Sequence, residues 1–294
     1  MVDLDTSHPK AWLPILRSLG HEVIGVYDGG TVYPPGYAEH FASENSIDRV
    51  FESLDEMAEV VDMAMIHSVN WDLHLERARP FVHAEKALFI DKPMAGNRRD
   101  LEQLLEWESQ GMRITGGSAL RYCNEVSNWL NEHDPFSEFV FAMAGCSTDE
   151  FNYGIHAYSL MHGLLGSGME SVRYLGSSMQ QQIEIAWEDG RKGLISVGAT
   201  KGYLPFYATV VTENDVSHFQ VDNNQLYRPM LETVLPYLAG ETQAPVPLQS
   251  LIEIELAAIA ARRSWQKDGR RIFLKDIPLD EPGYDGMRFA KAYR

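Results

Sequence analysis

The chain has 294 residues, of which 45% are hydrophobic, and carries a net charge of −17. This length is long for a single domain and predicts two, and the hydrophobic content supports a sizeable core and argues against disorder. The negative charge argues against nucleic acid and anionic membrane surfaces as partners.

The two cysteines, Cys123 and Cys146, lack the close spacing of a metal site. No signal peptide precedes them, so we expect free thiols in a reducing compartment and a cytoplasmic protein. No stretch of the sequence approaches the ~18 apolar residues of a membrane span.

The first 28 residues follow the layout of a dinucleotide-binding unit. Residues 2–4 read as the end of a strand that is too short for a central strand, which predicts a truncated or mis-started N-terminus. Residues 5–9 form a turn, a helix follows to about residue 19, and residues 21–28 form a second strand. Asp28 ends this strand, where such units place the acid that binds the ribose.

The turn before this helix departs from the usual G-x-G-x-x-G pattern because it contains no glycine. Asp3 and Asp5 place negative charge where a pyrophosphate would lie. The helix N-terminus still offers free N–H groups and the positive end of its dipole, and Thr6, Ser7 and His8 can donate hydrogen bonds. We therefore expect residues 5–8 to bind a dinucleotide more weakly than a glycine-rich turn, or to have lost that binding.

Strands and helices alternate through the rest of this half. Predicted strands cover residues 49–51, 62–67, 87–90 and 112–115, and predicted helices cover residues 37–44, 53–60, 72–83 and 98–110. Repeated strand–helix units imply a doubly wound parallel sheet. His67 and Asn70 follow a strand at the edge where ligands bind, so they are candidate cofactor contacts.

The motif Asp91-Lys92-Pro93 directly follows the apolar run of residues 87–90. This pattern is typical of a buried parallel strand whose carboxyl end opens at the ligand-binding edge of the sheet. Pro93 disfavours helix at Lys92 and holds the lysine extended. On these residues alone, a solvated lysine at a strand end is the simpler interpretation.

After Gly116 the pattern changes to an α+β type. Predicted strands cover residues 138–144, 180–187, 191–199, 207–212 and 219–221, and predicted helices cover residues 122–130, 226–238 and 248–267. We expect two domains, a Rossmann-like domain over residues 1–118 and an α+β domain over residues 119–294. The second has a mostly antiparallel open sheet with helices on one face. If residues 151–160 are helical, Asn152 and His156 lie one turn apart on one face.

Taken together, these motifs resemble the Gfo/Idh/MocA family of oxidoreductases, which includes glucose–fructose oxidoreductase and inositol dehydrogenase. Asp91-Lys92-Pro93 stands where the family has Glu-Lys-Pro, and Asn152 and His156 stand where it has an Asp-x-x-x-His pair. The chain resembles in particular a branch with Asp-Thr-Ser-His, here residues 5–8, in place of the glycine loop. The resemblance covers nearly the whole chain.

The resemblance implies a site for hydride transfer between NAD and a sugar, polyol or related carbohydrate. His156 would accept the hydroxyl proton of the substrate, Asn152 would orient His156, and Lys92 would stabilise the developing alkoxide. Asp91 would join Lys92 among the cofactor contacts. The substrate pocket would be lined by Arg121, Tyr122, Tyr153 and Tyr158.

Two other functions stay open at this point. A non-catalytic carbohydrate-binding or scaffold protein of the same fold would explain the glycine-free turn. A metal-dependent enzyme using His8, His67 and His156 is less favoured, because these histidines lack close ligand spacing and we expect no metal.

A homodimer or homotetramer is the expected assembly. An antiparallel sheet with helices on one face leaves its other face to be covered, and family members resembling this chain usually dimerise through that sheet. The alternating apolar residues suit such a contact; they are Ile183, Ile185, Trp187, Leu194, Ser196, Phe206, Ala208 and Val210.

Overall fold

The computed structural model describes residues 1–135 and 139–293, and the chain forms two compact units. The first unit combines Met1–Gly117 with Leu231–Leu248 and Asp285–Arg294, and the second combines Ser118–Met230 with Gln249–Tyr284. Over the described residues, no helix is both long and apolar enough to cross a membrane.

The first unit is built on parallel strands. Strands β3 (Met63–Ile66), β4 (Ala87–Asp91) and β5 (Ile114–Gly117) form one parallel sheet, and β1 (Gly25–Val26) pairs in parallel with β2 (Arg49–Val50). Val2 lies between these two groups and makes single parallel bridges to Tyr27 and Ile66. Every residue of β4 is buried, as expected for a central strand of a sheet covered on both faces.

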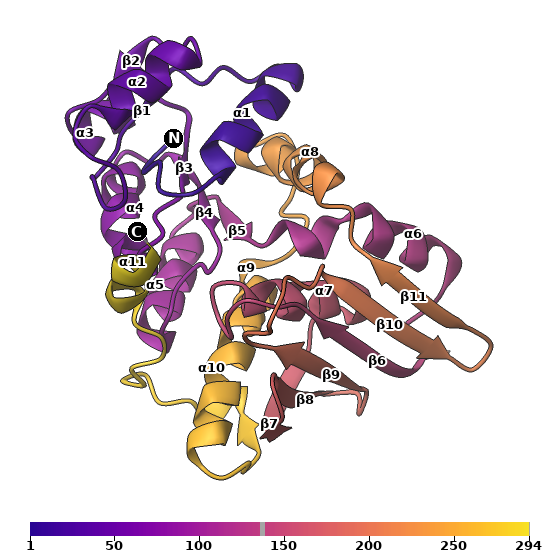
Figure 1. The fold of residues 1–294 in the computed structure, drawn as a ribbon. Coiled ribbons are helices and arrows are strands. Elements are labelled where there is room, and N and C mark those ends of the chain that lie inside the picture. Colours follow the sequence, from indigo (N-terminus) through magenta and orange to yellow (C-terminus); the bar gives the residue numbers. More distant parts are fainter. Residues whose placement is uncertain (136–138, 294) are drawn as a thin grey trace. The chain divides into compact units, whose positions relative to one another are not determined.

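Helices connect these strands in the βαβ manner (Figure 1). Side-chain caps begin two of them, because Ser53 accepts a hydrogen bond from the Glu56 N–H and Asn97 accepts one from the Asp100 N–H. The helical elements are α1 (His8–Ser18), α2 (Tyr37–Glu44), α3 (Leu54–Val60), η1 (Trp71–Leu73), α4 (His74–His83), α5 (Arg98–Ser109) and α11 (Gly286–Tyr293).

The second unit is built on one seven-stranded sheet in the order β11-β10-β6-β9-β8-β7-β12. All neighbouring strands are antiparallel except β6 and β9, which run parallel. The strands are β6 (Phe139–Gly145), β7 (Met169–Ser177), β8 (Gln181–Trp187), β9 (Lys192–Val197), β10 (Tyr207–Thr212), β11 (Val216–Gln220) and β12 (Ile272–Phe273).

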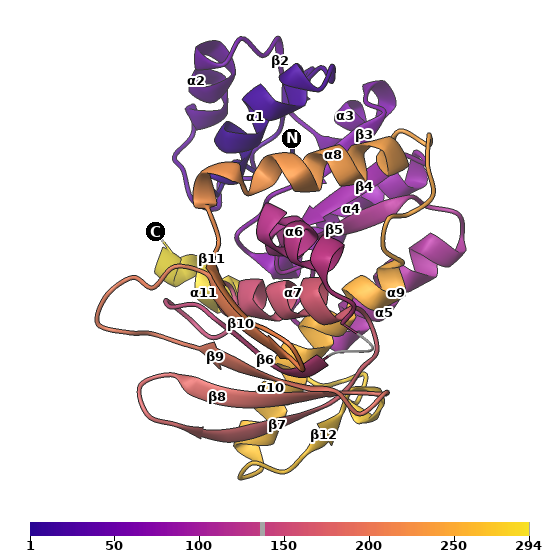
Figure 2. The same ribbon diagram turned by 90° about the vertical axis from the view of Figure 1, so that its right-hand side faces the viewer.

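Two helices, α7 (Gly154–Leu165) and α10 (Glu253–Gln266), pack on this sheet (Figure 2). Every residue of α7 is buried, so it forms the centre of the unit's core. The other helical elements after residue 118 are η2 (Ala119–Tyr122), α6 (Asn124–Glu132), η3 (Asn223–Gln225), α8 (Tyr227–Leu238), α9 (Leu248–Leu251) and η4 (Leu274–Asp276).

The predicted fold class, a Rossmann-like parallel sheet followed by a mostly antiparallel sheet with helices, is confirmed. Several predicted elements differ in their limits. The strand predicted over residues 21–28 shortens to β1, β7 was not predicted at all, and Glu138 lies outside the described residues. The predicted helix over residues 248–267 is divided into α9 and α10.

The predicted contact face of the second sheet is wrong in part. Ile183, Ile185 and Trp187 are almost fully buried within the single chain, as are Ala208 and Val210. Their side chains belong to the core and cannot meet another copy. The alternate positions of neighbouring strands form the opposite face; in register they are Arg173, Glu184, Leu194, Met143 and Thr209.

Candidate active site

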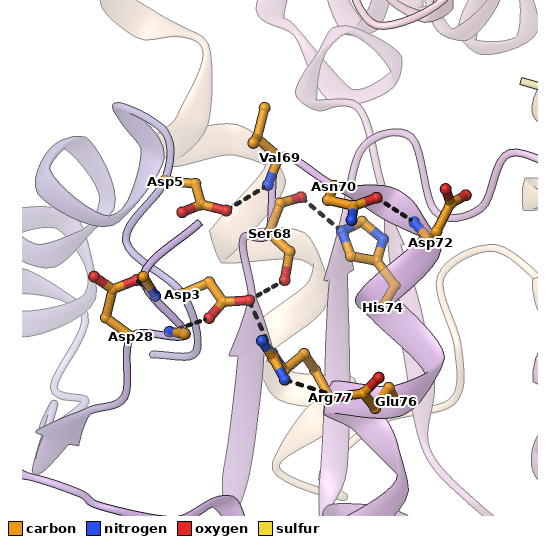
Figure 3. Close-up of polar contacts among 12 residues, drawn as sticks. Asp3, Asp5, Asp28, Ser68, Val69, Asn70, Asp72, His74, Glu76 and Arg77 are labelled. Carbon is orange, nitrogen blue, oxygen red and sulfur yellow. Dashed lines mark hydrogen bonds and ion pairs between the residues drawn. The ribbon is translucent and has the colours of Figure 1, made fainter. Parts of the chain in front are cut away.

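The turn between Val2 and α1 gathers carboxylates at the carboxyl edge of the first unit's sheet. Asp3 is buried with a φ of 56°, a left-handed conformation that aspartate tolerates better than most residues. Its Oδ1 accepts a hydrogen bond from the Gly29 N–H at 2.8 Å, and its Oδ2 accepts from Ser68 Oγ and from Arg77 Nε (Figure 3). Arg77 therefore forms an ion pair with Asp3, and its charge also acts on Asp5 and Asp28.

Asp5 lies next to this pair and is 1% exposed. Its Oδ2 accepts a hydrogen bond from the Val69 N–H at 2.9 Å (Figure 3). Its Oδ1 has no hydrogen-bond partner among the residues that the structure describes. Burial raises the pKa of the Asp5 carboxyl to about 7, with further contributions from the charges of Asp3 and Asp28. Asp5 can therefore exchange a proton near neutral pH.

Asp28 follows β1 and is partly buried. It accepts a hydrogen bond from the Gly30 N–H at 3.3 Å, and burial raises the pKa of its carboxyl above the usual value. The polypeptide after Asp28 passes close to Asp3 and Arg77. A Cβ atom at Gly29 would lie 2.3 Å from Arg77 Nη2 and 3.0 Å from Asp3 Oδ1, so glycine suits this close approach.

His8, His67 and Asp91 form a second cluster in the first unit. Asp91 Oδ2 lies 2.5 Å from His8 Nδ1 and 3.0 Å from His67 Nδ1. Burial alone would raise the pKa of Asp91, but His8 and His67 hold that pKa well below its usual value. Burial lowers the pKa of His67. The cluster therefore holds an ionised carboxylate between two imidazoles at the end of β4.

Lys92 is partly buried directly after this carboxylate, and its N–H donates to Asp91 Oδ1 at 2.7 Å. The Lys92–Pro93 peptide bond is cis. β4 and β5 are held close together, because a Cβ atom at Gly116 would lie 2.0 Å from the Ile90 carbonyl oxygen. β4, which leads into Lys92, therefore depends on Gly116 for its close packing against β5.

The loop after β3 carries the other predicted contacts of this unit. Asn70 is buried and accepts a hydrogen bond from the Asp72 N–H, so its side chain shapes the start of η1 (Figure 3). His74 is buried between two backbone carbonyls, those of Met94 and Ser68, as suits a structural residue. Thr6 Oγ1 accepts from the His8 N–H. Ser7 makes no side-chain capping bond to α1 within the described chain, so at this helix end the Thr6 hydroxyl takes the place of a Ser7 cap.

The second unit holds the predicted base. His156 is buried in the first turn of α7, and its Nδ1 lies 2.6 Å from Ser118 Oγ. The rings of Tyr153 and Phe206 meet His156 edge-on, with centroids 5.6 and 4.8 Å away. α7 begins at Gly154, so Asn152 lies in the preceding turn and not on the helix as predicted. Ser118 was missed by sequence reasoning, although it follows a strand end as Lys92 does.

The other predicted substrate contacts lie deeper. Arg121 donates from Nε to His162 Nδ1 at 3.0 Å, and burial lowers the pKa of its guanidinium. Tyr158 is 1% exposed, and burial raises the pKa of its phenol well above the usual value. Tyr122 is 7% exposed, while Tyr153 is partly exposed beside His156. Arg121 and Tyr158 suit structural roles, and Tyr153 is the better candidate for a ligand contact.

The structure thus gathers the predicted residues into two groups. His8, His67 and Asp91 meet within the first unit, and His156 lies beside Ser118 and Tyr153 within the second. A cavity in the first unit lies elsewhere, at the amino ends of β1 and β3, where its lining includes Met1, Ile24 and Met63. That end is opposite to the ligand-binding edge, so the cavity carries no site residue.

In an open parallel sheet with crossover helices, ligands bind at the carboxyl ends of the strands, which is where these polar residues of the first unit lie. Comparison with known families finds a match in this part of the chain. Residues 7–115 match the model of the oxidoreductase family with an NAD-binding Rossmann fold, Gfo/Idh/MocA. This match covers less than half of the chain and shows that the first unit is similar to the NAD-binding domain of this family.

A curated relative is the oxidoreductase subunit assigned to UDP-kanosamine synthase in Amycolatopsis mediterranei (strain S699). It is 28% identical over 127 residues, which are 43% of this chain and 34% of the relative. The chain therefore matches about a third of that relative's length.

Solved structures of similar fold cover almost the whole chain. Scyllo-inositol dehydrogenase from Lactobacillus casei has a TM-score of 0.77 at 12% identity, over 94% of this chain and 97% of that one. GenD2 from gentamicin A biosynthesis, in complex with NAD, has a TM-score of 0.78 at 15% identity, over 92% and 95%. Myo-inositol dehydrogenase from L. casei, with NAD(H) and myo-inositol, has a TM-score of 0.73 at 17% identity, over 92% and 95%. At these identities the likeness shows the fold.

Proposed function

We propose that this protein is an NAD-dependent oxidoreductase that transfers hydride between nicotinamide and a hydroxyl carbon of a sugar, polyol or related carbohydrate. The observation that carries the proposal is the NAD-binding family match over residues 7–115 together with Lys92 at the carboxyl end of β4. Structural neighbours that bind NAD(H) and inositols support the same substrate class. A cytoplasmic location, with Cys123 and Cys146 as free thiols, is part of this proposal.

The residues at the turn suit a dinucleotide, except that the Asp5 carboxylate opposes its negative charge. Ser7 does not cap α1 with its side chain, and only the Thr6 hydroxyl is recorded on the His8 N–H within the described chain, so this helix end suits phosphate binding. Asp28 follows β1, where a carboxylate accepts hydrogen bonds from a ribose hydroxyl. Asp5 opposes an anionic ligand when it is ionised. The bound cofactor would supply the hydride acceptor or donor.

The chain's own residues would handle the proton. We infer that His156 accepts the hydroxyl proton of the substrate, because a base must lie within hydrogen-bond reach of that oxygen. Ser118, 2.6 Å from His156 Nδ1, would hold the imidazole ring in its orientation. Lys92 would stabilise the oxygen as it gains negative charge. Tyr153, at the edge of His156, would contact the substrate.

Titration of the purified chain with NADH and NADPH, followed by calorimetry, tests this proposal. Saturable binding of NADH that exceeds binding of NADPH is expected, because Asp28 would repel a 2′-phosphate. An Asp28→Ala variant should lose that preference, and Asp48→Ala, at an exposed position, is the control. No binding of either nucleotide at about 1 mM, the upper range of ordinary substrate affinities, would support the non-catalytic alternative instead.

A further inference from the structure

His8, His67 and Asp91 bring two imidazoles and one carboxylate together in the first unit. The three side chains come from three elements: the first residue of α1, the residue after β3, and the last residue of β4. One nitrogen or oxygen of each lies within 4.8 Å of those of the other two. His67 and Asp91 are buried, and the His8 side chain is 12% exposed. Burying such groups is costly unless they are paired or bind a metal.

Neighbouring groups hold the cluster in place. The Trp12 ring is stacked on His8, with centroids 5.4 Å apart, and meets His67 nearly at right angles at 4.8 Å. Asp91 Oδ1 accepts the Lys92 N–H, which leaves Oδ2 for the two imidazoles. A second hydrogen bond of this kind commonly fixes a carboxylate that binds a metal. Nε2 of His67 has no hydrogen-bond partner in the described part of the chain, so the polar contacts of this ring lie on its Nδ1 side.

We propose that His8, His67 and Asp91 bind a first-row divalent metal ion such as Zn²⁺, Co²⁺, Mn²⁺ or Fe²⁺. Two imidazoles and one carboxylate form a donor set that these ions accept. Mg²⁺ and Ca²⁺ fit less well because they prefer oxygen ligands. Ligands must be deprotonated to bind a metal, so Asp91 would bind as a carboxylate and both histidines as neutral imidazoles. A divalent ion would then leave one positive charge at the start of α1.

The separations between the three ligand atoms suit a bound metal ion after a small movement of the His8 ring. Metal–ligand bonds of ~2.1 Å at right angles place neighbouring ligand atoms ~3.0 Å apart. The separation of His67 Nδ1 and Asp91 Oδ2 is 3.0 Å. The separation of His8 Nδ1 and Asp91 Oδ2 is 2.5 Å, so the His8 ring must retreat by about half an ångström. His8 is the most exposed of the three and lies in the first helical turn, where such a shift is easiest.

Three protein ligands leave coordination positions open, as in catalytic metal sites. The ion would lie beside Lys92 at the ligand-binding edge of the first unit, where water or an oxygen of a ligand could complete its coordination. The inference does not depend on nicotinamide chemistry. A protein that failed to bind NADH could still bind the metal, and one that bound NADH without metal would keep the proposed function and lose this site.

The experiment uses the whole chain after treatment with EDTA. Calorimetric titration with Zn²⁺ and with Co²⁺ should show one site per chain, and bound Co²⁺ should give visible absorption bands. Thermal unfolding should shift upward with metal, because an ion that binds only the folded state stabilises it. His67→Ala and Asp91→Asn should weaken binding at least about tenfold and remove the thermal shift.

His83→Ala, at the end of α4, controls for adventitious binding by other histidines. His8→Ala keeps the test decisive if a buried variant fails to fold, because His8 is partly exposed and its loss should leave the fold intact. Absence of binding at about 100 μM metal would overturn the inference and leave a hydrogen-bonded cluster without an ion. Binding of equal affinity in the wild type and in the three cluster variants would overturn it too, since the ion would then sit on other groups.

Discussion

The most informative single residue is Asp5, because its carboxyl replaces glycine in the turn that would receive a pyrophosphate. Asp3 and Asp28 add negative charge nearby, and Arg77 supplies the positive charge that faces them. Since burial raises the pKa of Asp5 to about 7, the proton on this carboxyl decides whether the turn repels a phosphate at neutral pH.

We expect the affinity for NADH to increase as the pH falls through about 7. Below that pH Asp5 is neutral and can donate a hydrogen bond; above it the carboxylate repels the ligand. If only the neutral form binds, the apparent affinity falls about tenfold for each pH unit above 7. Calorimetric titrations between pH 6 and 9 measure this slope, in the wild type and in Asp5→Asn, which should bind equally at all of these values. Asp48→Asn, exposed in the same unit, should keep the wild-type slope.

Lys92 and His156 are expected to act as one catalytic unit. With an active inositol or sugar substrate, Lys92→Ala and His156→Ala should each reduce kcat by at least about a hundredfold, the usual contribution of general acid–base catalysis. The double variant should be little worse than either single variant, because members of one unit fail non-additively. Lys86→Ala, at a partly exposed lysine before β4, is the control. Turnover within a few-fold of wild type in Lys92→Ala would disprove the assignment.

At the scale of elements, the strand β4 organises the candidate site because it ends in Asp91 and leads into Lys92. Its packing against β5 depends on Gly116, whose hydrogen faces the Ile90 backbone. A side chain there would separate the two strands and move the end of β4. The position of the end of β4 and the stability of the sheet therefore both depend on Gly116.

Gly116→Ala should destabilise the protein by about 1–3 kcal/mol, the usual cost of forcing an extra methyl into a packed core. The contact would be with backbone, which cannot rotate away as a side chain can. Gly202→Ala is the matched control, because a Cβ atom there meets nothing within 4 Å. Urea unfolding of the wild type and of both variants measures their free energies of unfolding. Equal stabilities would show that β4 and β5 can separate without cost.

Local pattern was enough to predict β3, β4 and β5, since short apolar runs ending in polar residues are typical of parallel strands. It also marked Lys92 as a candidate, whereas His156 became one through the resemblance to the Gfo/Idh/MocA family. It could not show that His8, His67 and Asp91 converge, because they are far apart in sequence and meet only through the sheet order. Asn152 was placed on a helix because a helical period fits it, yet the helix starts two residues later.

For the whole molecule, neither of the two units is a single continuous segment of the chain. Leu231–Leu248 and Asp285–Arg294 join the first unit although they follow most of the second in sequence. The C-terminal helix α11 is fixed there by a hydrogen bond from the Met287 N–H to Asp72 and by the contact of Phe289 with Trp71. Long-range contacts of this kind leave no periodic signal, so they follow only from the structure.

The last prediction concerns assembly through the second unit's sheet. Partly exposed apolar residues, among them Phe141, Met143, Leu194 and Val211, lie on the face opposite to the buried one. An exposed apolar sheet face is typical of a contact between protein subunits. We therefore expect light scattering at micromolar concentration to show a homodimer or homotetramer. Leu194→Lys should shift the mass toward the monomer, because a charge would be buried in the contact. Leu279→Lys places the same change at an exposed position outside the sheet and should not. A monomeric wild type would refute this assembly, and an oligomer unaffected by Leu194→Lys would place the contact on another surface.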